Sequence, residues 1–515
     1  RIDIDSNGYF RIPFDSLYAI NPSLDNIDNN LIQLFNDGVE QRIDVDPDLG
    51  IMFFGSEAPP PQGVEYDKNF YTSTNHYWLT WGTQEGLRYG IENVYPSLDM
   101  STIESPLSFV SKNKFESNQK QIRLGGVNTN EQWDGFEHFF YRKVVAGGGN
   151  EDYNFQLSNL LESGTYKLTV KLQGVINSFR RVNLSLNDRL LGSIEWSGIR
   201  SQKFISNDFP NSDLINGLNN LYISVEDLDD GVDKVALDWI EIEYDHKYKV
   251  NEDQLYFNKQ GNYSTHAHFN IGGFSNSNII IFKTGETRLT DFLITEYEDD
   301  FHAVFQDQII NESQSYFSSS IDKIPYPSSI QEVQPLEDLN NHESNYIIIA
   351  PDSFRQALEP MLIHYDAVIK TPESIYRTYS NGVISPYAIK EFLTNAYMTW
   401  SIRPEFVLIA QDKHIPAMSM QTVLYGSTFS DYWYALLIGD DYVPEVSVGR
   451  FPAKSKSELE VMVNKNMHIL NSENQIWENT ILMIAGYDNE FRTQTEELIP
   501  NIAKKGFFPK RLYVD

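Results

Sequence analysis

The hydrophobic pattern of this 515-residue chain changes its period near residue 345. Before that point, short segments alternate apolar and polar residues, as strands with one buried face do. After it, continuous apolar runs such as Tyr346–Ala350 and Phe406–Ala410 alternate with segments of helical length. Apolar strands interleaved with helices are typical of a parallel sheet covered on both faces. The chain is therefore expected to be multidomain, with N-terminal all-β domains followed by an α/β domain.

The length of the chain predicts three or four domains. The clearest strand pattern lies between residues 131 and 247, where Gly and Asn separate four alternating stretches: Tyr166–Leu172, Val182–Asp188, Leu221–Asp227 and Ala236–Tyr244. Such spacing is typical of an antiparallel β-sandwich or jelly roll. The predicted domains are a β-rich N-terminal domain over 1–130, the sandwich over 131–247, a β-rich segment and linker over 248–335, and the α/β domain over 336–515.

The α/β domain is expected to contain amphipathic helices over Ser353–Tyr365, Tyr387–Trp400, Lys456–Leu470 and Glu490–Lys505. Ser385 and Pro386 are residue types that start a helix, and Gly506 is a type that ends one. One more apolar strand, Leu512–Val514, then has no successor. Because apolar strands of this kind normally lie inside a sheet, the domain is expected to be incomplete at Asp515.

Charge and cysteine content argue against several classes of function. The chain has 40 basic and 72 acidic residues, and its net charge of −32 repels polyanions such as nucleic acids. It contains no cysteine, which excludes a disulfide scaffold, a thiolate metal site and a thiol nucleophile within these residues. The sequence contains no stretch of about 18 apolar residues, so no membrane-spanning helix is predicted. The chain begins at Arg1 without a signal-peptide pattern, which is compatible with a processed or trimmed extracellular protein.

Acidic and polar residues follow the strands Phe406–Ala410 and Ile481–Ala485. Because the carboxyl ends of parallel strands meet at one edge of a sheet, we expect a ligand pocket there. The pocket candidates are Asp412, His414, Asp431, Asp440, Asp441 and Asp488. In one interpretation these side chains bind a cation or a basic substrate group. In the other they cap helices and turns, which is the more frequent role of a single aspartate.

Two neighbouring candidates, Asp412 and His414, have two interpretations of their own. They form an acid–base pair in one, and His414 is a solvated histidine in the other, because adjacent loop residues often point apart. No glycine-rich phosphate loop follows a strand in this domain, which argues against a nucleotide enzyme.

Three acid-rich loops predict calcium sites in one interpretation. Two lie near the N-terminus, at Asp3–Gly8 and Asp44–Gly50. The third joins two strands of the predicted sandwich and contains Asp227, Asp229, Asp230 and Asp233. Oxygen ligands crowded on a glycine-containing turn can wrap a Ca²⁺ ion. The alternative is that these Asp, Asn and Gly residues form ordinary hairpin turns.

Three segments of the α/β part, Ile375–Leu393, Phe406–Pro416 and Ser430–Lys465, together resemble the gingipain-like cysteine peptidases of family C25. The first contains a turn followed by the helix entry SPYAIKEFL, and the third contains the pattern S-D-x-x-Y…G-D-D…G-R-F-P. The N-terminal part, with Asn7–Leu17 and Tyr77–Gly82, is similar to the surface sortases of the bacterial type IX secretion system. The third segment is the most specific.

The resemblance implies a caspase-like fold for the α/β domain and a His–Cys dyad, which is expected beyond Asp515. Thiolate attack would give an acyl-enzyme that water or an amine resolves. Gln411 stands where the family usually has glycine, which weakens the expectation of close backbone binding there. Asp488 falls near the acidic pocket residue of the family. Arg492 stands near the position where arginine-specific members carry an aspartate, so arginine specificity is not implied.

The predicted function is a cell-surface cysteine peptidase or sortase that cleaves C-terminal secretion signals of exported proteins and transfers them to an amine acceptor. The expected partners are secreted cargo proteins and an outer-membrane β-barrel shuttle protein, without nucleic acid or a direct membrane span. The expected location is the bacterial cell surface, in association with the outer membrane, and calcium is the one cofactor considered. The alternative is a non-catalytic, calcium-stabilised scaffold that binds carbohydrate or a partner. A glycine-flanked histidine and a strand-end cysteine after Asp515 would favour the peptidase.

Overall fold

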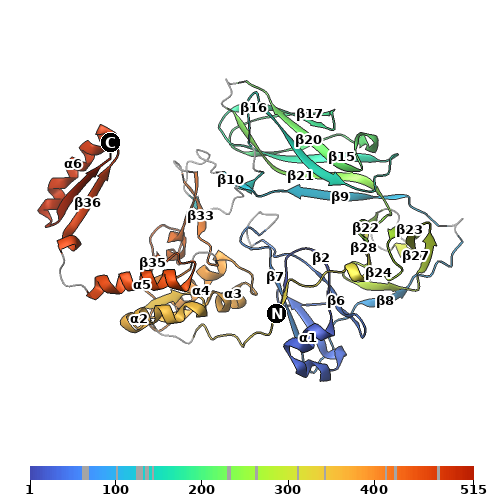
Figure 1. The fold of residues 1–515 in the computed structure, drawn as a ribbon, viewed down its shortest axis with the longest axis horizontal. Coiled ribbons are helices and arrows are strands. Elements are labelled where there is room, and N and C mark those ends of the chain that lie inside the picture. Colours follow the sequence, from blue (N-terminus) through green and yellow to red (C-terminus); the bar gives the residue numbers. More distant parts are fainter. Residues whose placement is uncertain are drawn as a thin grey trace. The chain divides into compact units, whose positions relative to one another are not determined.

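The computed structural model describes residues 1–60, 69–99, 103–122, 132–133, 139–141, 144–228, 233–260, 265–309, 313–340, 344–411, 414–422, 426–471 and 476–514. The chain divides into two compact units, whose elements are drawn in Figure 1. The first contains Arg1–Asn341, Pro372–Trp400 and His414–Val448, and the second contains His342–Thr371, Ser401–Lys413 and Gly449–Asp515. The predicted change from β structure to α/β structure is confirmed. Within the described residues, no helix is long and apolar enough to cross a membrane.

The N-terminal β domain of the first unit contains two small sheets. One has the order β29-β1-β7-β3-β4, with bounds Ser329–Ile330, Ile2–Ile4, Asn75–Trp81, Ile32–Asn36 and Val39–Gln41. The other has the order β2-β6-β5, with bounds Gly8–Ile12, Gly50–Gly55 and Asp44–Asp46. Alternating apolar residues of both sheets and Leu17 of α1 (Phe14–Ile20) share one core. Because β29 pairs with β1, a segment more than 300 residues away closes this domain.

The predicted sandwich forms from two sheets that share a single apolar core. One sheet has the order β13-β21-β15-β18, with bounds Val144–Ala146, Lys234–Lys247, Thr165–Gly174 and Ser201–Ile205. The other has the order β14-β20-β16-β17, with bounds Asn150–Leu157, Gly217–Val225, Phe179–Leu186 and Arg189–Ser197. The short β19 (Phe209–Pro210) pairs with β15. Strand β9 (Ser108–Glu116) also joins this sandwich although it precedes residue 131, because the long β21 extends past β13 and leaves an edge for it.

A buried ion pair lies inside this sandwich. Arg180 of β16 is fully buried, and its Nε lies 3.0 Å from Oδ1 of Asp233. Its Nη1 donates to the carbonyl of Gly198 at 2.7 Å, and Nη2 donates to the carbonyl of Ile176. The guanidinium also stacks over the ring of Trp196, 4.9 Å from the ring centre. All three guanidinium nitrogens therefore have partners, which is the condition for a stable buried charge.

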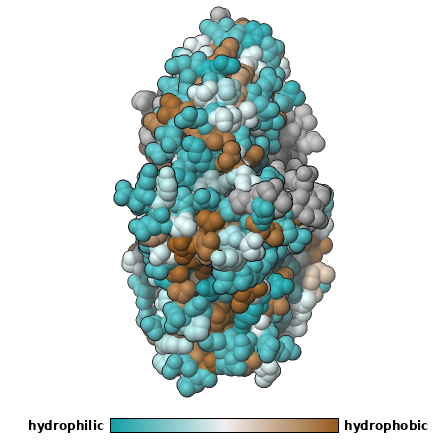
Figure 2. All heavy atoms as spheres, turned by 90° about the vertical axis from the view of Figure 1, so that its right-hand side faces the viewer, coloured by the Kyte–Doolittle hydropathy of each residue, from teal (hydrophilic) through white to brown (hydrophobic). Residues whose placement is uncertain are grey.

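Residues 248–335, which were predicted as a segment and linker, contain a second sandwich. Its first sheet has the order β22-β28-β24-β25-β8, with bounds Gln254–Gln260, Ser313–Ser320, Ile279–Lys283, Thr287–Thr290 and Gly90–Asn93. Its second sheet has the order β23-β27-β26, with bounds Thr265–Phe274, Asp300–Ile309 and Leu293–Tyr297. Both sheets contribute to one aromatic-rich core. Figure 2 views the molecule from the side of β23 and β27 and shows a mainly hydrophilic surface with scattered hydrophobic patches.

The second unit contains the predicted parallel sheet. Its strand order is β31-β30-β32-β35, with bounds Val368–Lys370, Tyr346–Ile349, Phe406–Ile409 and Ser447–Arg450. β30 pairs in parallel with both β31 and β32. The helices α2 (Arg355–Tyr365) and α5 (Lys456–Asn471) pack together with Ile348 and Leu408 in one core. The consecutive residues Ile347, Ile348 and Ile349 are all buried, as expected of a strand covered on both faces.

The last two strands form a separate sheet. β36 (Thr480–Ala485) and β37 (Phe508–Tyr513) pair in parallel and are joined by α6 (Asn489–Lys504). The sequence pattern predicted a continuation of the larger sheet, but among the described strands β36 pairs with β37 alone. Leu482 and Ile484 of β36 are half or more exposed, so these apolar side chains are not packed on both faces.

The remaining α/β-like elements belong to the first unit. They are α3 (Pro372–Tyr379), α4 (Pro386–Thr399), the hairpin β33 (Met418–Thr422) and β34 (Gly426–Ser430), and the 3₁₀ turn η7 (Asp431–Ala435). The turn between α3 and α4 contacts β7 of the N-terminal domain, because Trp78 Nε1 donates to the carbonyl of Asn381 at 3.3 Å. The guanidinium of Arg377 lies 5.2 Å from the centre of the Trp78 ring.

The buried pair in the first sandwich leads to a stability prediction. Replacing Asp233 by Ala leaves the Arg180 charge buried without its carboxylate, so we expect the free energy of unfolding to fall by about 3–5 kcal/mol. Urea denaturation followed by circular dichroism measures this change. The neighbouring Arg181 pairs with Glu195 and Glu226 at the surface and is the matched control. Arg181→Ala is expected to change stability little, and equal losses in both variants would contradict the prediction.

Candidate functional site

Two buried tyrosines hold the loop that follows the central strand β32. Tyr376 of α3 donates its hydroxyl to the carbonyl of His414 at 2.5 Å. Tyr434 of η7 donates its hydroxyl to the carbonyl of Pro416. Between these two carbonyls, Ile415 is fully buried. The three segments that carry the family resemblance therefore meet at this loop, and its backbone is fixed while the side chain of His414 stays exposed.

A second set of polar groups lies at the carboxyl ends of the parallel strands in the second unit. Lys370 ends β31 and is fully buried. Arg450 ends β35 and donates from Nη1 to the carbonyl of Gln411 at 2.8 Å, just past the end of β32. The side-chain Oε1 of Gln411 is buried and accepts no hydrogen bond from the described residues. Among the described residues this edge therefore carries two cations and an amide, and the predicted Asp412, which follows Gln411, lies outside them.

The predicted pocket residues lie in different places. Asp412 lies outside the described residues, and Asp431 occupies the first turn of η7. Asp440 and Asp441 are exposed in the loop after η7, where Asp441 Oδ1 accepts a hydrogen bond from the backbone of Val443 at 2.8 Å. Asp441 therefore has the turn role that the sequence analysis considered. That these side chains share one pocket stays a prediction.

Asp488 caps a helix. Its Oδ1 accepts a hydrogen bond from the backbone N–H of Glu490 at 2.9 Å, at the start of α6. Arg492 in the first turn of the same helix donates to the carbonyl of Gly486 at 3.2 Å and to that of Val514 at 3.1 Å. The start of α6 therefore carries a carboxylate, Asp488, and a guanidinium, Arg492, which are four residues apart in sequence.

Two further residues of the family-like segments were missed by the sequence analysis. Glu445 accepts hydrogen bonds from the backbone N–H groups of Leu437 and Ile438 at 2.6 and 3.1 Å and so folds the loop after η7. Lys390 of α4 places its amine 4.2 Å from the centre of the Trp433 ring. Burial lowers the pKa of Lys390, and the charge of Glu445 partly opposes that shift. Neither role has a local sequence signal, because the partners are more than five residues away.

The two acid-rich loops near the N-terminus are neutralised by protein cations. Asp3 accepts from Arg1 at 2.9 Å and contacts Nδ1 of His76 at 2.8 Å. Burial raises the pKa of Asp3, but the hydrogen bond from His76 and the charge of Arg1 outweigh this and hold it below its usual value. In the second loop, Asp44 and Asp46 both pair with Arg288, at 3.2 and 2.9 Å.

In the third acid-rich loop, Asp233 forms an ion pair with Arg180. Asp227 is described, and it precedes residues 229–232, which are not. Asp229 and Asp230 lie outside the described residues. Over the described part of the chain, no group of three or more His, Asp or Glu side chains is placed to hold a metal ion. Calcium binding at this loop therefore stays a prediction, with Asp227, Asp229 and Asp230 as the remaining ligands.

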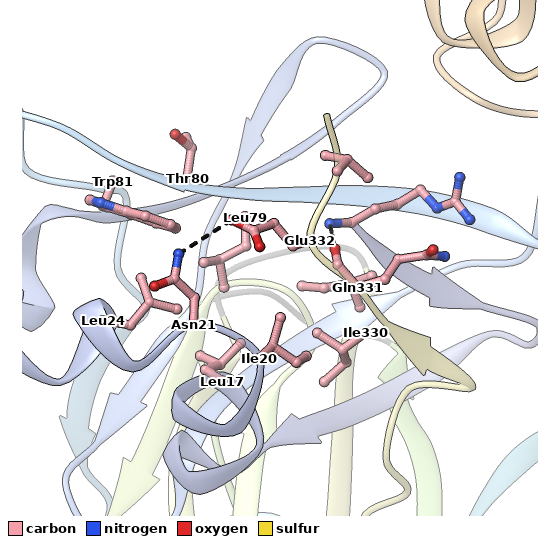
Figure 3. A pocket seen from close by; sticks show the side chains of 13 residues that line it. Leu17, Ile20, Asn21, Leu24, Leu79, Thr80, Trp81, Ile330, Gln331 and Glu332 are labelled. Carbon is pink, nitrogen blue, oxygen red and sulfur yellow. Dashed lines mark hydrogen bonds between the residues drawn. The ribbon is translucent and has the colours of Figure 1, made fainter. Parts of the chain in front are cut away.

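A separate hollow lies in the N-terminal β domain (Figure 3). It has a volume of about 220 Å³. Its walls are mainly apolar and its rim is polar; the labelled lining residues are Leu17, Ile20, Asn21, Leu24, Leu79, Thr80, Trp81, Ile330, Gln331 and Glu332. The rim is closed on one side by a hydrogen bond of 3.5 Å from Asn21 Nδ2 to Glu332 Oε1. The apolar walls suit an apolar group better than a charged reaction centre.

The arrangement of the α/β elements agrees with a family comparison. Residues 340–515 match the model of peptidase family C25. This part of the chain is therefore similar to the gingipain-like C25 peptidases. The match includes the parallel sheet, both helices α2 and α5, and the loops that Tyr376 and Tyr434 hold. None of the curated proteins compared with the chain matches it.

Solved structures extend the similarity to the β domains. The crystal structure of dimeric latent PorU from Porphyromonas gingivalis superposes with a TM-score of 0.58 and 14% identity, over 96% of this chain and 54% of that one. The chain therefore spans about half of the length of PorU. The complex of Porphyromonas gingivalis RgpB pro- and mature domains is similar at a TM-score of 0.27 and 22% identity, over 33% of this chain and 42% of that one. At such identities the similarity to PorU shows a shared fold and domain layout.

The two tyrosines give a prediction for the loop after β32. Tyr376→Phe and Tyr434→Phe each leave a backbone carbonyl without its buried donor, so we expect a loss of about 1 kcal/mol of stability per variant. Chemical denaturation measures the loss, and hydrogen exchange at Ile415 locates it. Tyr432 also donates to a carbonyl, that of Tyr442, but is 43% exposed, so water replaces the bond in Tyr432→Phe. A loss in this control as large as in the buried pair would contradict the prediction.

The calcium interpretation gives a prediction of its own. If the 227–233 loop holds Ca²⁺, a chelator lowers the melting temperature, because the ion binds only the folded state. Asp227→Asn is expected to remove the difference between the chelated and the calcium-supplemented protein. Asp188→Asn, in another exposed turn of the same sandwich, is expected to retain it. Equal melting temperatures with and without chelator would rule out the calcium site.

Proposed function

We propose that this chain is part of a cell-surface cysteine peptidase of the gingipain-like family that removes C-terminal secretion signals from exported proteins and transfers the products to an amine acceptor. The observation that carries the proposal is the C25 match over residues 340–515, together with the parallel sheet and loops found there. The PorU-like layout of the β domains favours the sortase over a secreted digestive peptidase. The substrates would be secreted cargo proteins.

The chemistry requires a thiolate, and these 515 residues contain no cysteine. In the proposed protein the Cys and its His partner therefore come from other residues of the same polypeptide. The thiolate attacks the carbonyl carbon at the cleavage point, and the C-terminal signal leaves with its new amino group. The acyl-enzyme is then resolved by water, which completes hydrolysis, or by an amine, which completes transpeptidation.

This chain would supply the frame around that reaction. The hydrogen bonds from Tyr376 and Tyr434 hold the loop after β32 in place, and Arg450 holds Gln411. Rigid loops at the carboxyl ends of parallel strands position a substrate, which accounts for much of the rate enhancement in such sites. The acidic surface of the chain, with a net charge of −32, suits a basic or neutral cargo terminus. An outer-membrane β-barrel shuttle protein is the proposed partner that delivers the cargo.

The test uses the full-length protein with a thiol-reactive probe and a cargo protein that carries its C-terminal signal. We expect the probe to label one cysteine and the folded protein to release the signal. Mass spectrometry of the cargo distinguishes a free carboxyl terminus, produced by hydrolysis, from an amide formed with an added amine. Replacing the labelled cysteine by Ala is the matched control and is expected to abolish both products. A folded protein that has no reactive thiol, or an Ala variant that still releases the signal, would overturn the proposal.

A further inference from the structure

A lysine, an aspartate and a glutamate meet between the two sheets of the second sandwich. Lys283 ends β24 in one sheet, Asp307 lies on β27 in the other, and Glu92 lies on β8. The amine Nζ of Lys283 is 2.9 Å from Oδ1 of Asp307 and 2.6 Å from Oε2 of Glu92. The side chains of Lys283 and Asp307 are only 7% and 0% exposed, whereas that of Glu92 is 41% exposed.

The two oxygens of Asp307 have different surroundings. The hydroxyl of the fully buried Tyr316 donates to Oδ2. Oδ1 is buried, and the Lys283 amine lies 2.9 Å from it. A phenol on one oxygen polarises the carboxyl group, as a hydrogen-bond donor on an oxyanion does in acyl transfer. The other oxygen is then the one that can leave.

The protonation of this cluster suits a condensation. Burial raises the pKa of Asp307, which favours the neutral carboxylic acid. Burial lowers the pKa of Lys283, but the hydrogen bonds and charges of Asp307 and Glu92 outweigh this and leave it raised. The cluster therefore holds the Lys283 ammonium beside a carboxyl group whose burial favours its neutral form.

We propose that Lys283 and Asp307 form an intramolecular isopeptide bond that links the two sheets of this sandwich. Glu92 first takes one proton from the ammonium. The free amine then attacks Cγ of Asp307, so that the Nζ–Cγ bond forms and the Cγ–Oδ1 bond breaks. In the reacting form Oδ1 already carries the acid proton of Asp307. It receives a second proton from the amine and leaves as water, and the third ammonium proton stays on the amide nitrogen. Glu92 then releases the first proton to solvent.

Two features favour the reaction over a lasting ion pair. The fold holds the amine and the carboxyl group in contact, which replaces a bimolecular encounter by an intramolecular one. The low exposure of both groups also favours departure of water and disfavours its return. The product is a neutral amide, so the ammonium charge, which is costly to keep buried, is removed.

The first sandwich contains a matched control pair. Lys171 Nζ lies 2.8 Å from Oδ2 of Asp238, and the Asp238 side chain is 3% exposed. Lys171 is 23% exposed, and Oδ1 of Asp238 has no hydrogen-bond partner among the described residues. This pair therefore has a comparable distance without the buried amine or the polarising phenol. It is expected to remain an ion pair.

Intact-mass spectrometry of the folded, full 515-residue chain tests the proposal. We expect a mass below that calculated from the sequence by one water molecule. Tryptic digestion is expected to give one branched peptide that joins Lys283 to Asp307, without cleavage after Lys283. The peptides containing Lys171 and Asp238 are expected to be separate. A folded protein of full calculated mass that is cleaved after Lys283, or a crosslink at Lys171 instead, would overturn the proposal.

Two variants separate the chemistry from folding. Glu92→Gln keeps the shape of the side chain but removes the proton acceptor, so the folded variant is expected to have the full calculated mass. Lys283→Met removes the nucleophile and is also expected to have no crosslink. Circular dichroism shows whether each variant folds. A folded Glu92→Gln variant that is completely crosslinked would overturn the role of Glu92.

Discussion

The β part of this protein depends on the neutralisation of acidic groups that folding places between its sheets. A chain with 72 acidic and 40 basic residues has few cations to use, and several of them lie at buried carboxylates. Arg180 pairs with Asp233 in the first sandwich, and Lys283 pairs with Asp307 in the second. A buried carboxylate without such a partner would cost several kcal/mol, so the position of each cation limits how the sheets can pack. Gly174 shows the tightness of one such site, since a Cβ there would lie 1.6 Å from Nη1 of Arg180.

The α/β part depends instead on hydrogen bonds to loop backbones. Four side chains form hydrogen bonds with main-chain groups of the loops in this part of the chain; they belong to Tyr376, Tyr434, Glu445 and Arg450. Such bonds fix a loop without adding a residue to the reaction itself, and they leave exposed side chains such as His414 in defined positions.

The two kinds of support fit one functional picture. A surface peptidase of the kind proposed above would work outside the cell, without energy-dependent repair. Buried ion pairs in the β domains, and a covalent crosslink between two sheets, would both slow the opening of those domains. The contact between Trp78 of β7 and the turn after α3 joins the N-terminal domain to the family-like helices. Loss of the β domains would therefore be expected to affect the loop that Tyr376 holds.

Much of the fold could be predicted from local pattern. Period-two alternation located the strands of the first sandwich, and the helix over Tyr387–Trp400 agrees with α4 to within a residue at each end. Local pattern could not show that β9 joins the first sandwich or that β8 joins the second, because strand pairing depends on which edges remain open. It also could not show that β36 and β37 form their own sheet, since the same apolar residues suit either arrangement.

The candidate site was less predictable than the fold. The acidic residues were visible in the sequence, but their contacts were not. In the structure Asp441 accepts a hydrogen bond within a turn, Asp488 caps a helix, and Asp233 forms an ion pair with Arg180. Composition and hydrophobic period determined the class of each region, the absence of a thiol and the positions of most elements. Tertiary structure alone decided which carboxylate meets which cation, because the partners are far apart in sequence and only folding brings them together; Asp44 and Arg288, for example, are 244 residues apart. Burial then sets the strength of each pair, and burial is a property of the packed sheets.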